Sequence, residues 1–124
     1  MTKPLALVVY EKLLPGSQLV NRLQDLGYRV QTITDATTLA ACAEQEKPLL
    51  ALVDLMARRS KVPDAVAKLR GNPATNHVPV IAFADEKDAA LQAAGRTAGA
   101  TLVVSDAALL THLEQFIDQA LVID

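Results

Sequence analysis

Short apolar runs alternate with longer amphipathic segments from one end of the chain to the other. Four runs contain only apolar residues: Leu5–Val9, Leu49–Val53, Val80–Phe83 and Leu102–Val104. Parallel strands that are covered by helices on both faces have this unbroken apolar character. A fifth run, Arg29–Ile33, alternates polar and apolar residues and predicts an edge strand with one face in water. The pattern therefore predicts five strands.

The segments between these runs have the apolar spacing of helices and carry residues that begin or end helices. We expect five helices. The first is Ser17–Leu26, with Leu19, Leu23 and Leu26 on one stripe and Gly27 after its end. The second is capped by Asp35 and carries Leu39 and Cys42, and the third is opened by Pro63 and carries Val66 and Leu69. For the fourth, Ala89–Ala98, Asp85 and Asp88 resemble a capping box. The last is capped by Ser105 or Asp106 and has two apolar rows, made by Leu109, Leu113, Phe116 and Ala120 and by Leu110, Ile117 and Leu121. Strands that alternate with helices predict a doubly wound α/β fold with a five-stranded parallel sheet in a three-layer sandwich.

The composition excludes several classes of protein. With 124 residues, of which 51% are hydrophobic, the chain has the usual length of one compact domain, and we expect a single domain over residues 1–124. A formal charge of −2 provides no basic field for nucleic acid. One cysteine and two histidines leave no ligand set for zinc, and no apolar run is long enough to cross a membrane. We expect a cytoplasmic protein that binds neither nucleic acid nor membrane.

The carboxyl ends of the strands are where sheets of this kind form their sites. The residues expected there are Tyr10-Glu11, Asp54, Ala84-Asp85 and Ser105-Asp106. Asp54 needs an explanation, because it ends an apolar run that we expect at the centre of the sheet. No glycine-rich phosphate loop follows the first run, where residues 10–16 read YEKLLPG. A small-molecule or flavin-binding protein of flavodoxin-like architecture is therefore disfavoured, although it remains an alternative.

Four segments share their order and spacing with one known family. They are Pro48-Leu49 leading to Asp54-Leu55-Met56, Leu26-Gly27-Tyr28, residues 72–81, which read NPATNHVPVI, and Ala98-Gly99-Ala100. Together they resemble the receiver domain of two-component response regulators, and the resemblance covers the whole chain. It implies a flavodoxin-like fold, a role in signal transduction, and Asp54 as the candidate phospho-acceptor.

The resemblance also identifies positions where this chain departs from the family. Receivers carry two acidic residues after the first strand, and the matching residues here are Tyr10 and Glu11. The hydroxyl residue that ends the fourth strand is replaced by Ala84. In the fifth strand the aromatic residue is replaced by Val103, and the lysine that follows it by Asp106. Of the usual set, only the phospho-accepting aspartate is intact.

These departures matter because phosphoryl transfer concentrates negative charge, which proteins offset with metal ions and cationic donors. Losing one such donor costs about two to three powers of ten in rate. If Asp106 reaches the site, its carboxylate repels a further anion. Glu11, Asp54 and the backbone carbonyl of Met56 are the ligands that the resemblance implies for a weak Mg²⁺ site. Capping the last helix is the role that we favour for Asp106.

Three cations follow the candidate phospho-acceptor. Arg58, Arg59 and Lys61 stand where receivers usually have a Pro-Gly turn and another acidic residue. A solvated basic loop is the simplest interpretation. The alternative is a docking patch for an acidic partner, or a set of cations that pair with Asp54 or Glu11.

We interpret the chain as a stand-alone, degenerate receiver-like domain that acts as a protein interaction module rather than as an enzyme, with phosphoryl acceptance at Asp54 weakened or lost. The alternative is a working receiver that a histidine kinase phosphorylates on Asp54. The expected partner is a histidine kinase or another signalling protein. The wide apolar surface of the last helix and the exposed Ala89 and Ala93 predict a homodimer through the last two helices.

Overall fold

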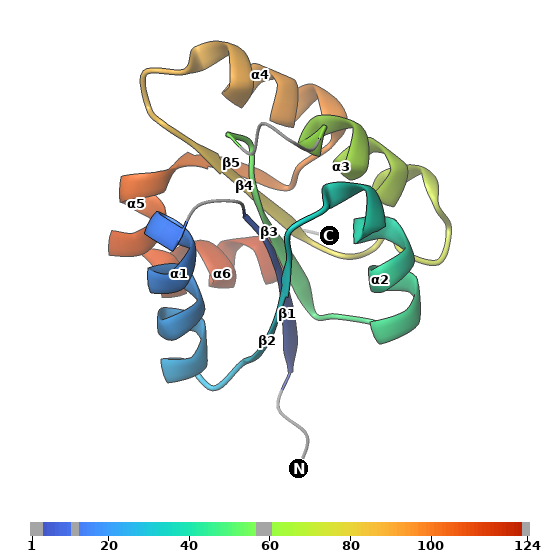
Figure 1. Cartoon of the computed structure of the whole chain (residues 1–124), viewed down its shortest axis with the longest axis horizontal. Coiled ribbons are helices and arrows are strands. Elements are labelled where there is room, and N and C mark those ends of the chain that lie inside the picture. Colours follow the sequence, from blue (N-terminus) through green and yellow to red (C-terminus); the bar gives the residue numbers. More distant parts are fainter. Residues whose placement is uncertain (1–3, 11–12, 57–60, 123–124) are drawn as a thin grey trace.

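The chain folds around a five-stranded parallel sheet with the strand order β2-β1-β3-β4-β5 (Figure 1). The computed structural model describes residues 4–10, 13–56 and 61–122, except for the side chains of residues 13–16 and 122. The strands are β1 (Leu5–Val9), β2 (Arg29–Ile33), β3 (Leu50–Asp54), β4 (Val80–Ala84) and β5 (Leu102–Ser105). The five strands, the central position of β3 and the edge position of β2 confirm the prediction from the apolar runs.

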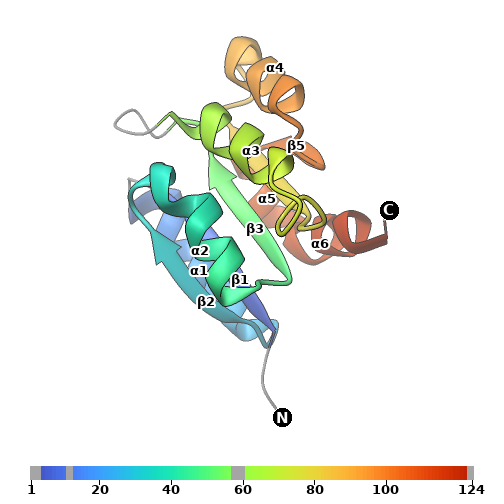
Figure 2. The ribbon, with the colours of Figure 1, turned by 90° about the vertical axis from the view of Figure 1, so that its right-hand side faces the viewer.

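Helices cover both faces of the sheet, as the doubly wound fold predicts (Figures 1 and 2). One face carries α1 (Leu13–Asp25), α5 (Asp106–Thr111) and α6 (Leu113–Val122), and the other carries α2 (Leu39–Glu46), α3 (Val62–Gly71) and α4 (Ala89–Ala98). Each face of the sheet has its own hydrophobic core under its helices. Because side chains alternate along a strand, Leu52 packs into the core under α1, α5 and α6, and Val53 packs into the core under α2, α3 and α4. None of the described helices combines the length and the apolar character of a membrane span.

Helix α1 begins at Leu13, earlier than the expected start at Ser17. Pro15 lies in its first turn, where a backbone N–H is not needed for helical hydrogen bonds. Gly27 follows the helix with a φ of +94°, which confirms its predicted role. Leu26 is 39% exposed in the turn after the helix, so its expected place on the buried stripe is wrong.

Hydrogen bonds show which aspartates cap the helices that lead into α2 and α4. The Asp35 carboxylate accepts from the backbone N–H of Thr37 at 3.0 Å, and it begins a short 3-10 helix, Ala36–Thr38, that leads into α2. Hydrogen bonds from Thr37 lower the pKa of the Asp35 carboxyl. At the next site the prediction is wrong, because Asp88 and not Asp85 caps α4, by accepting from the N–H of Leu91.

The last helix is broken in two, where the sequence predicted one. Helix α5 ends at Thr111, and His112 has φ −123° and ψ 33°, outside the helical region. The Thr111 hydroxyl donates to the carbonyl of Ala107 at 3.0 Å, a side-chain bond that competes with the helix and bends it. The break still buries Leu109 and Leu113, but it leaves Leu121 36% exposed.

Lys47 carries local backbone strain. Its φ of +51° is the only positive value among the described residues other than glycine. It follows α2 in the left-handed position that glycine usually occupies. We expect Lys47→Gly to raise the free energy of unfolding by about 0.5–1 kcal/mol, since glycine adopts this conformation without a steric cost. Urea denaturation measures the gain, and Lys47→Ala, which keeps the Cβ atom, should show none.

The Cys42 thiol is protected by its surroundings. It accepts a hydrogen bond from the Gln31 side-chain amide at 3.2 Å, and burial, with a smaller effect of Glu46, raises the pKa of the thiol. We expect iodoacetamide to modify Cys42 roughly three- to tenfold more slowly in the folded protein than in urea. Because the folded-state pKa lies above the unfolded one, the thiol's stabilising contribution is full below about pH 8.5 and is lost as the pH rises through the folded pKa. Cys42→Ala should remove that loss, and equal alkylation rates would contradict the prediction.

Candidate functional site

The strand registers bring the predicted positions to one edge of the sheet. Val9 of β1 pairs with Val53 of β3, so Tyr10 and Asp54 follow at the ends of neighbouring strands. Asp54 pairs with Phe83 of β4, and Ala84 pairs with Ser105 of β5. This is the carboxyl edge, where sites of doubly wound sheets form.

Asp54 is a buried carboxylate at the end of the central strand. It is 2% exposed, and it is one of two buried polar or charged residues in the described part of the chain, with Thr75. The backbone N–H of Met56 donates to its Oδ1 atom at 2.8 Å. A carboxylate loses much hydration free energy on burial, so its position is maintained by specific partners rather than by chance.

The segment after Asp54 contacts the loop after β4 and helix α4. The thioether sulfur of Met56 accepts from the backbone N–H of Asp85 at 3.3 Å, and the N–H of Leu55 donates to the carbonyl of Phe83 at 2.9 Å. Leu55 packs so closely on α4 that a Cβ atom at Gly95 would lie 2.9 Å from its Cδ1 atom. The sequence interpretation considered only the backbone carbonyl of Met56. It missed the side chain, because a thioether acceptor has no sequence signature.

Ala84 and Val103 make this part of the site apolar. Ala84 is fully buried in the core between the sheet and α2, α3 and α4, and Val103 packs partly buried against the same core. Neither side chain has a polar atom. The positions that carry a hydroxyl and an aromatic ring in the resembling family therefore offer neither a hydrogen bond to a phosphoryl oxygen nor a large ring that changes position.

Ser105 rather than Asp106 caps α5. The Ser105 hydroxyl accepts from the N–H of Ala108 at 3.1 Å, which corrects the favoured role of Asp106. Asp106 is the first residue of the helix, half-buried, and its Oδ1 atom accepts from the adjacent N–H of Ala107 at 2.8 Å. A carboxylate is favourable at a helix N-terminus. Asp106 therefore has a structural reason to be acidic at this position.

Tyr10 closes the same edge from β1. Its ring is half-buried against the core under α1, α5 and α6, and its backbone N–H donates to the carbonyl of Ile33 at 3.2 Å. An aromatic ring thus occupies a position where the resemblance expects a carboxylate.

Several predicted residues lie outside the described part of the chain. They are Glu11, Arg58 and Arg59, whereas Lys61 is exposed at the residue before α3. Among the described residues, no three His, Cys, Asp or Glu side chains gather into a group that could hold a metal ion.

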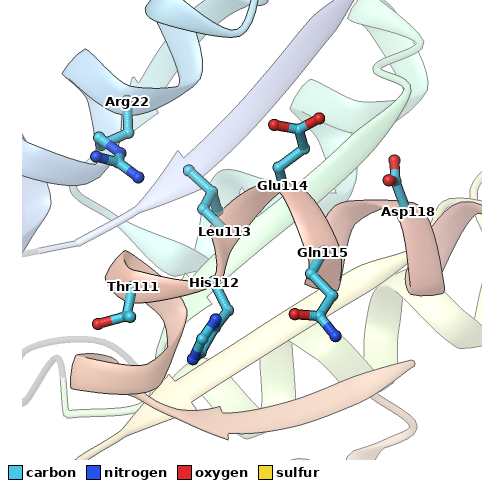
Figure 3. Close-up of a pocket in the computed structure, with 7 residues that line it drawn as sticks. All are labelled: Arg22, Thr111, His112, Leu113, Glu114, Gln115 and Asp118. Atoms are coloured by element: carbon cyan, nitrogen blue, oxygen red, sulfur yellow. The ribbon is translucent and has the colours of Figure 1, made fainter.

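A pocket of about 440 Å³ lies at the break between α5 and α6, facing α1 (Figure 3). In Figure 3, Glu114 and Asp118 extend from one side of α6, and Arg22 of α1 approaches its start. Burial, with a smaller effect of the Asp118 charge, raises the pKa of the nearby Tyr28 hydroxyl. The residues that line this pocket do not include Asp54, so it is separate from the candidate site.

Comparison with known proteins finds likeness in structure alone. No protein-family profile and no curated protein sequence matches the chain. The receiver domain of sensor histidine kinase PA1611 from Pseudomonas aeruginosa, with magnesium in its active-site cleft, is similar with a TM-score of 0.87 and 18% identity over 97% of this chain and 98% of that one. The NtrX receiver domain from Brucella abortus is similar with a TM-score of 0.83 and 17% identity, over 96% of this chain and 99% of that one.

The receiver domain of a signal transduction histidine kinase from Syntrophus aciditrophicus also gives a TM-score of 0.83, with 17% identity over 95% of this chain and 89% of that chain. The match covers the whole sheet and its helices in each case. The chain therefore has the flavodoxin-like α/β fold of response-regulator receiver domains.

Proposed function

We propose that this chain is a receiver-like module of two-component signalling that acts through protein contacts, with phosphoryl acceptance at Asp54 weak or lost. The receiver fold supports the signalling role. The proposal that phosphoryl acceptance is weak or lost rests on the carboxyl edge of the sheet. There the buried Asp54 is accompanied by the methyl group of Ala84 and the carboxylate of Asp106. These positions supply a hydroxyl and an ammonium group in the family that the sequence resembles.

The charge balance of this edge opposes phosphoryl transfer. A phosphoryl group on Asp54 would bring additional negative charge to a buried carboxylate, and the transition state needs donors aimed at its oxygens. Ala84 has no donor, and the Asp106 carboxylate has none when ionised. On this proposal the module transmits its signal by recognition of its folded surface.

Incubation with acetyl phosphate and MgCl₂, followed by intact mass spectrometry, tests the proposal. We expect no stable phosphoryl adduct under conditions that fully modify a working receiver domain run in parallel. An adduct that disappears in Asp54→Asn would contradict the proposal. It would favour the alternative of a working receiver, in which Glu11 holds the metal and a cation of the loop, such as Arg58 or Lys61, replaces the missing lysine.

The contact surface that we propose for a homodimer is the face formed by α4, β5 and the predicted last helix, which the structure divides into α5 and α6. Ala89 and Ala93 are exposed on α4, all four residues of β5 are half-buried at the sheet edge, and Leu110 of α5 is half-buried. Charged side chains are depleted in the buried core of contact surfaces, and the residues named here are uncharged. Sedimentation velocity at high micromolar concentration should show a dimer that Ala93→Glu dissociates. Ala67→Glu, an exposed alanine of α3, is the matched control, and a wild-type monomer would contradict this surface.

The basic residues Arg58, Arg59 and Lys61 are the proposed docking patch for an acidic histidine kinase or signalling partner. Charges of one sign speed association and select partners of the opposite sign. Recovery of partners from the native cell should weaken when Arg58 and Arg59 are replaced by alanine and should persist in Asp54→Asn. The reverse pattern would assign recognition to Asp54.

A further inference from the structure

The end of the sheet opposite Asp54 contains a second pocket, of about 510 Å³. Its lining includes residues from the starts of β1, β2, β3 and β4 and from the end of α6, so it lies at the amino edge. Six of the residues that line it are Arg29, Lys47, Pro48, Leu49, His77 and Leu121. This volume is within the usual range for small-molecule sites.

Two of the exposed large apolar side chains of the described chain line the pocket. Leu49 is 41% exposed and Leu121 is 36% exposed, although Leu50, the next residue along β3, is fully buried. The third exposed large apolar residue of the described chain is Leu26, which precedes β2 at the same end of the molecule. Single exposed apolar residues are ordinary, but their concentration at one edge, beside a pocket, indicates a surface that is covered by a ligand.

The charged side chains that the structure describes in the lining of the pocket, Arg29 and Lys47, are both basic. Arg29, Lys47 and His77 line it, and no aspartate or glutamate is among its described lining residues, although the whole chain has a formal charge of −2. Lys47 is also the residue held in the left-handed conformation, which strains the backbone. The pocket therefore combines an apolar floor with a basic rim.

We propose that this amino-edge pocket binds a small apolar monocarboxylate. The apolar part of the ligand covers Leu49, Pro48 and Leu121, and its carboxylate lies between Lys47 and His77. A few polar groups that orient an otherwise apolar ligand are the general composition of small-molecule sites. A carboxylate forms an ion pair with the Lys47 ammonium group and accepts a hydrogen bond from the His77 imidazole, whereas a neutral head group forms no ion pair.

Titration with octanoate, followed by ¹H–¹⁵N NMR spectra, tests the proposal. We expect saturable shifts confined to residues 4–5, 29–30, 47–50, 77–80 and the end of α6, and no comparable saturation with octanamide, which has the same chain and no charge. Lys47→Gly should weaken octanoate binding about three- to fivefold, the range of a partly exposed ion pair. Because the glycine relieves backbone strain, the weakening does not arise from a loss of folding.

Two further variants complete the design. Leu49→Asp places a carboxylate beside the ligand at an exposed position, and it should weaken binding about tenfold or more. Lys87→Gly removes an equivalent charge from the opposite edge and should leave binding unchanged. Equal binding of octanamide, equal weakening by both lysine variants, or shifts spread over other surfaces would each overturn the proposal. None of these results depends on whether Asp54 accepts a phosphoryl group.

Discussion

Restoring the residues that the site lacks is expected to raise the rate of phosphoryl transfer from acetyl phosphate to Asp54 by about a thousandfold. The variant combines Tyr10→Asp, Ala84→Thr and Asp106→Lys. Each change adds one group that the resembling family uses: a metal-binding carboxylate, a hydroxyl and an ammonium donor. Since a single preorganised donor contributes about two to three powers of ten in rate, three changes that act in part together give at least this increase.

The fold tolerates these changes to different degrees. Ser105 provides the cap of α5, so Asp106→Lys leaves the cap in place. The change removes the hydrogen bond from the N–H of Ala107 and places a cation at the helix N-terminus, where a carboxylate is favourable. Ala84 is fully buried, and the larger threonine costs about 1–3 kcal/mol if its surroundings cannot adjust. Ala84→Ser adds the hydroxyl with less bulk and is the second variant if threonine destabilises the protein.

The rate is measured as the accumulation of adduct by intact mass in the presence of MgCl₂. The triple variant with Asp54→Asn is the control, because any adduct that remains there is on another residue. Single variants divide the increase among the three groups. A triple variant that folds, as judged by its urea denaturation, and still shows no adduct would contradict this prediction, because the weak phosphoryl acceptance that we propose would then not arise from Tyr10, Ala84 and Asp106.

The sheet was predictable because its strands are buried on both faces. Residues such as Leu50 and Leu52 have to be apolar on one side of β3, and Ala51 and Val53 on the other, which leaves an unbroken apolar run in the sequence. The same reasoning identified Asp54 as an exception at the end of β3. The structure gives that exception a position at the carboxyl edge of the sheet.

The helix ends and the side-chain contacts were less predictable because they depend on tertiary structure. Asp85 and Asp88 both precede α4, and the hydrogen bond from the N–H of Leu91 identifies Asp88 as its cap. At the break, the hydroxyl of Thr111 donates to the carbonyl of Ala107, and His112 lies outside the helical region. The contact of Met56 with Asp85 joins residues that are 29 positions apart, so local sequence patterns do not reveal it.

Arg70 was also missed, and its removal is expected to cause a large loss of stability. The sequence of α3 carries no signal that distinguishes Arg70 from an ordinary charged residue of a helix surface. In the structure its Nε atom donates to the carbonyl of Gly99, and its two terminal nitrogens donate to the carbonyl of Asn76 and to the hydroxyl of Thr101, each at 2.7 Å. Burial lowers the pKa of the guanidinium, as expected for a cation without a carboxylate in these contacts.

These bonds join three parts of the fold. Arg70 connects α3 with the turn before β5 and with the loop before β4. The Thr101 hydroxyl accepts from Arg70 and from the N–H of Val80 at 3.0 Å, so it extends the contact to the start of β4. Gly99 has a φ of +106°, and a Cβ atom there would lie 2.9 Å from the Cγ atom of Arg70. The close fit of the arginine side chain therefore depends on a glycine at the end of α4.

We expect Arg70→Met to lower the free energy of unfolding by about 2–3 kcal/mol. Methionine preserves the aliphatic contact with Gly99 and removes all three hydrogen bonds. Each has a charged donor, and such a bond has a net value of about 1.5–3 kcal/mol. The sum is smaller here because water can replace the donor at the exposed carbonyl of Asn76. Arg70→Lys should recover less than half of the loss, because one ammonium group cannot reach three acceptors in the geometry of a planar guanidinium.

Urea denaturation with an unchanged m-value measures this loss. Lys68→Met is the matched control, since Lys68 is exposed on the same helix and loses the same charge, and its effect should stay within about 0.5 kcal/mol. If Arg70→Met and Lys68→Met were equally stable, the three bonds would contribute nothing beyond what water supplies to the same carbonyls. If Arg70→Lys matched the wild type, a single charge near Gly99 and Thr101 would suffice. The intermediate stability that we expect for lysine follows from the separation of the three acceptors, which belong to the loop before β4 and to the turn before β5.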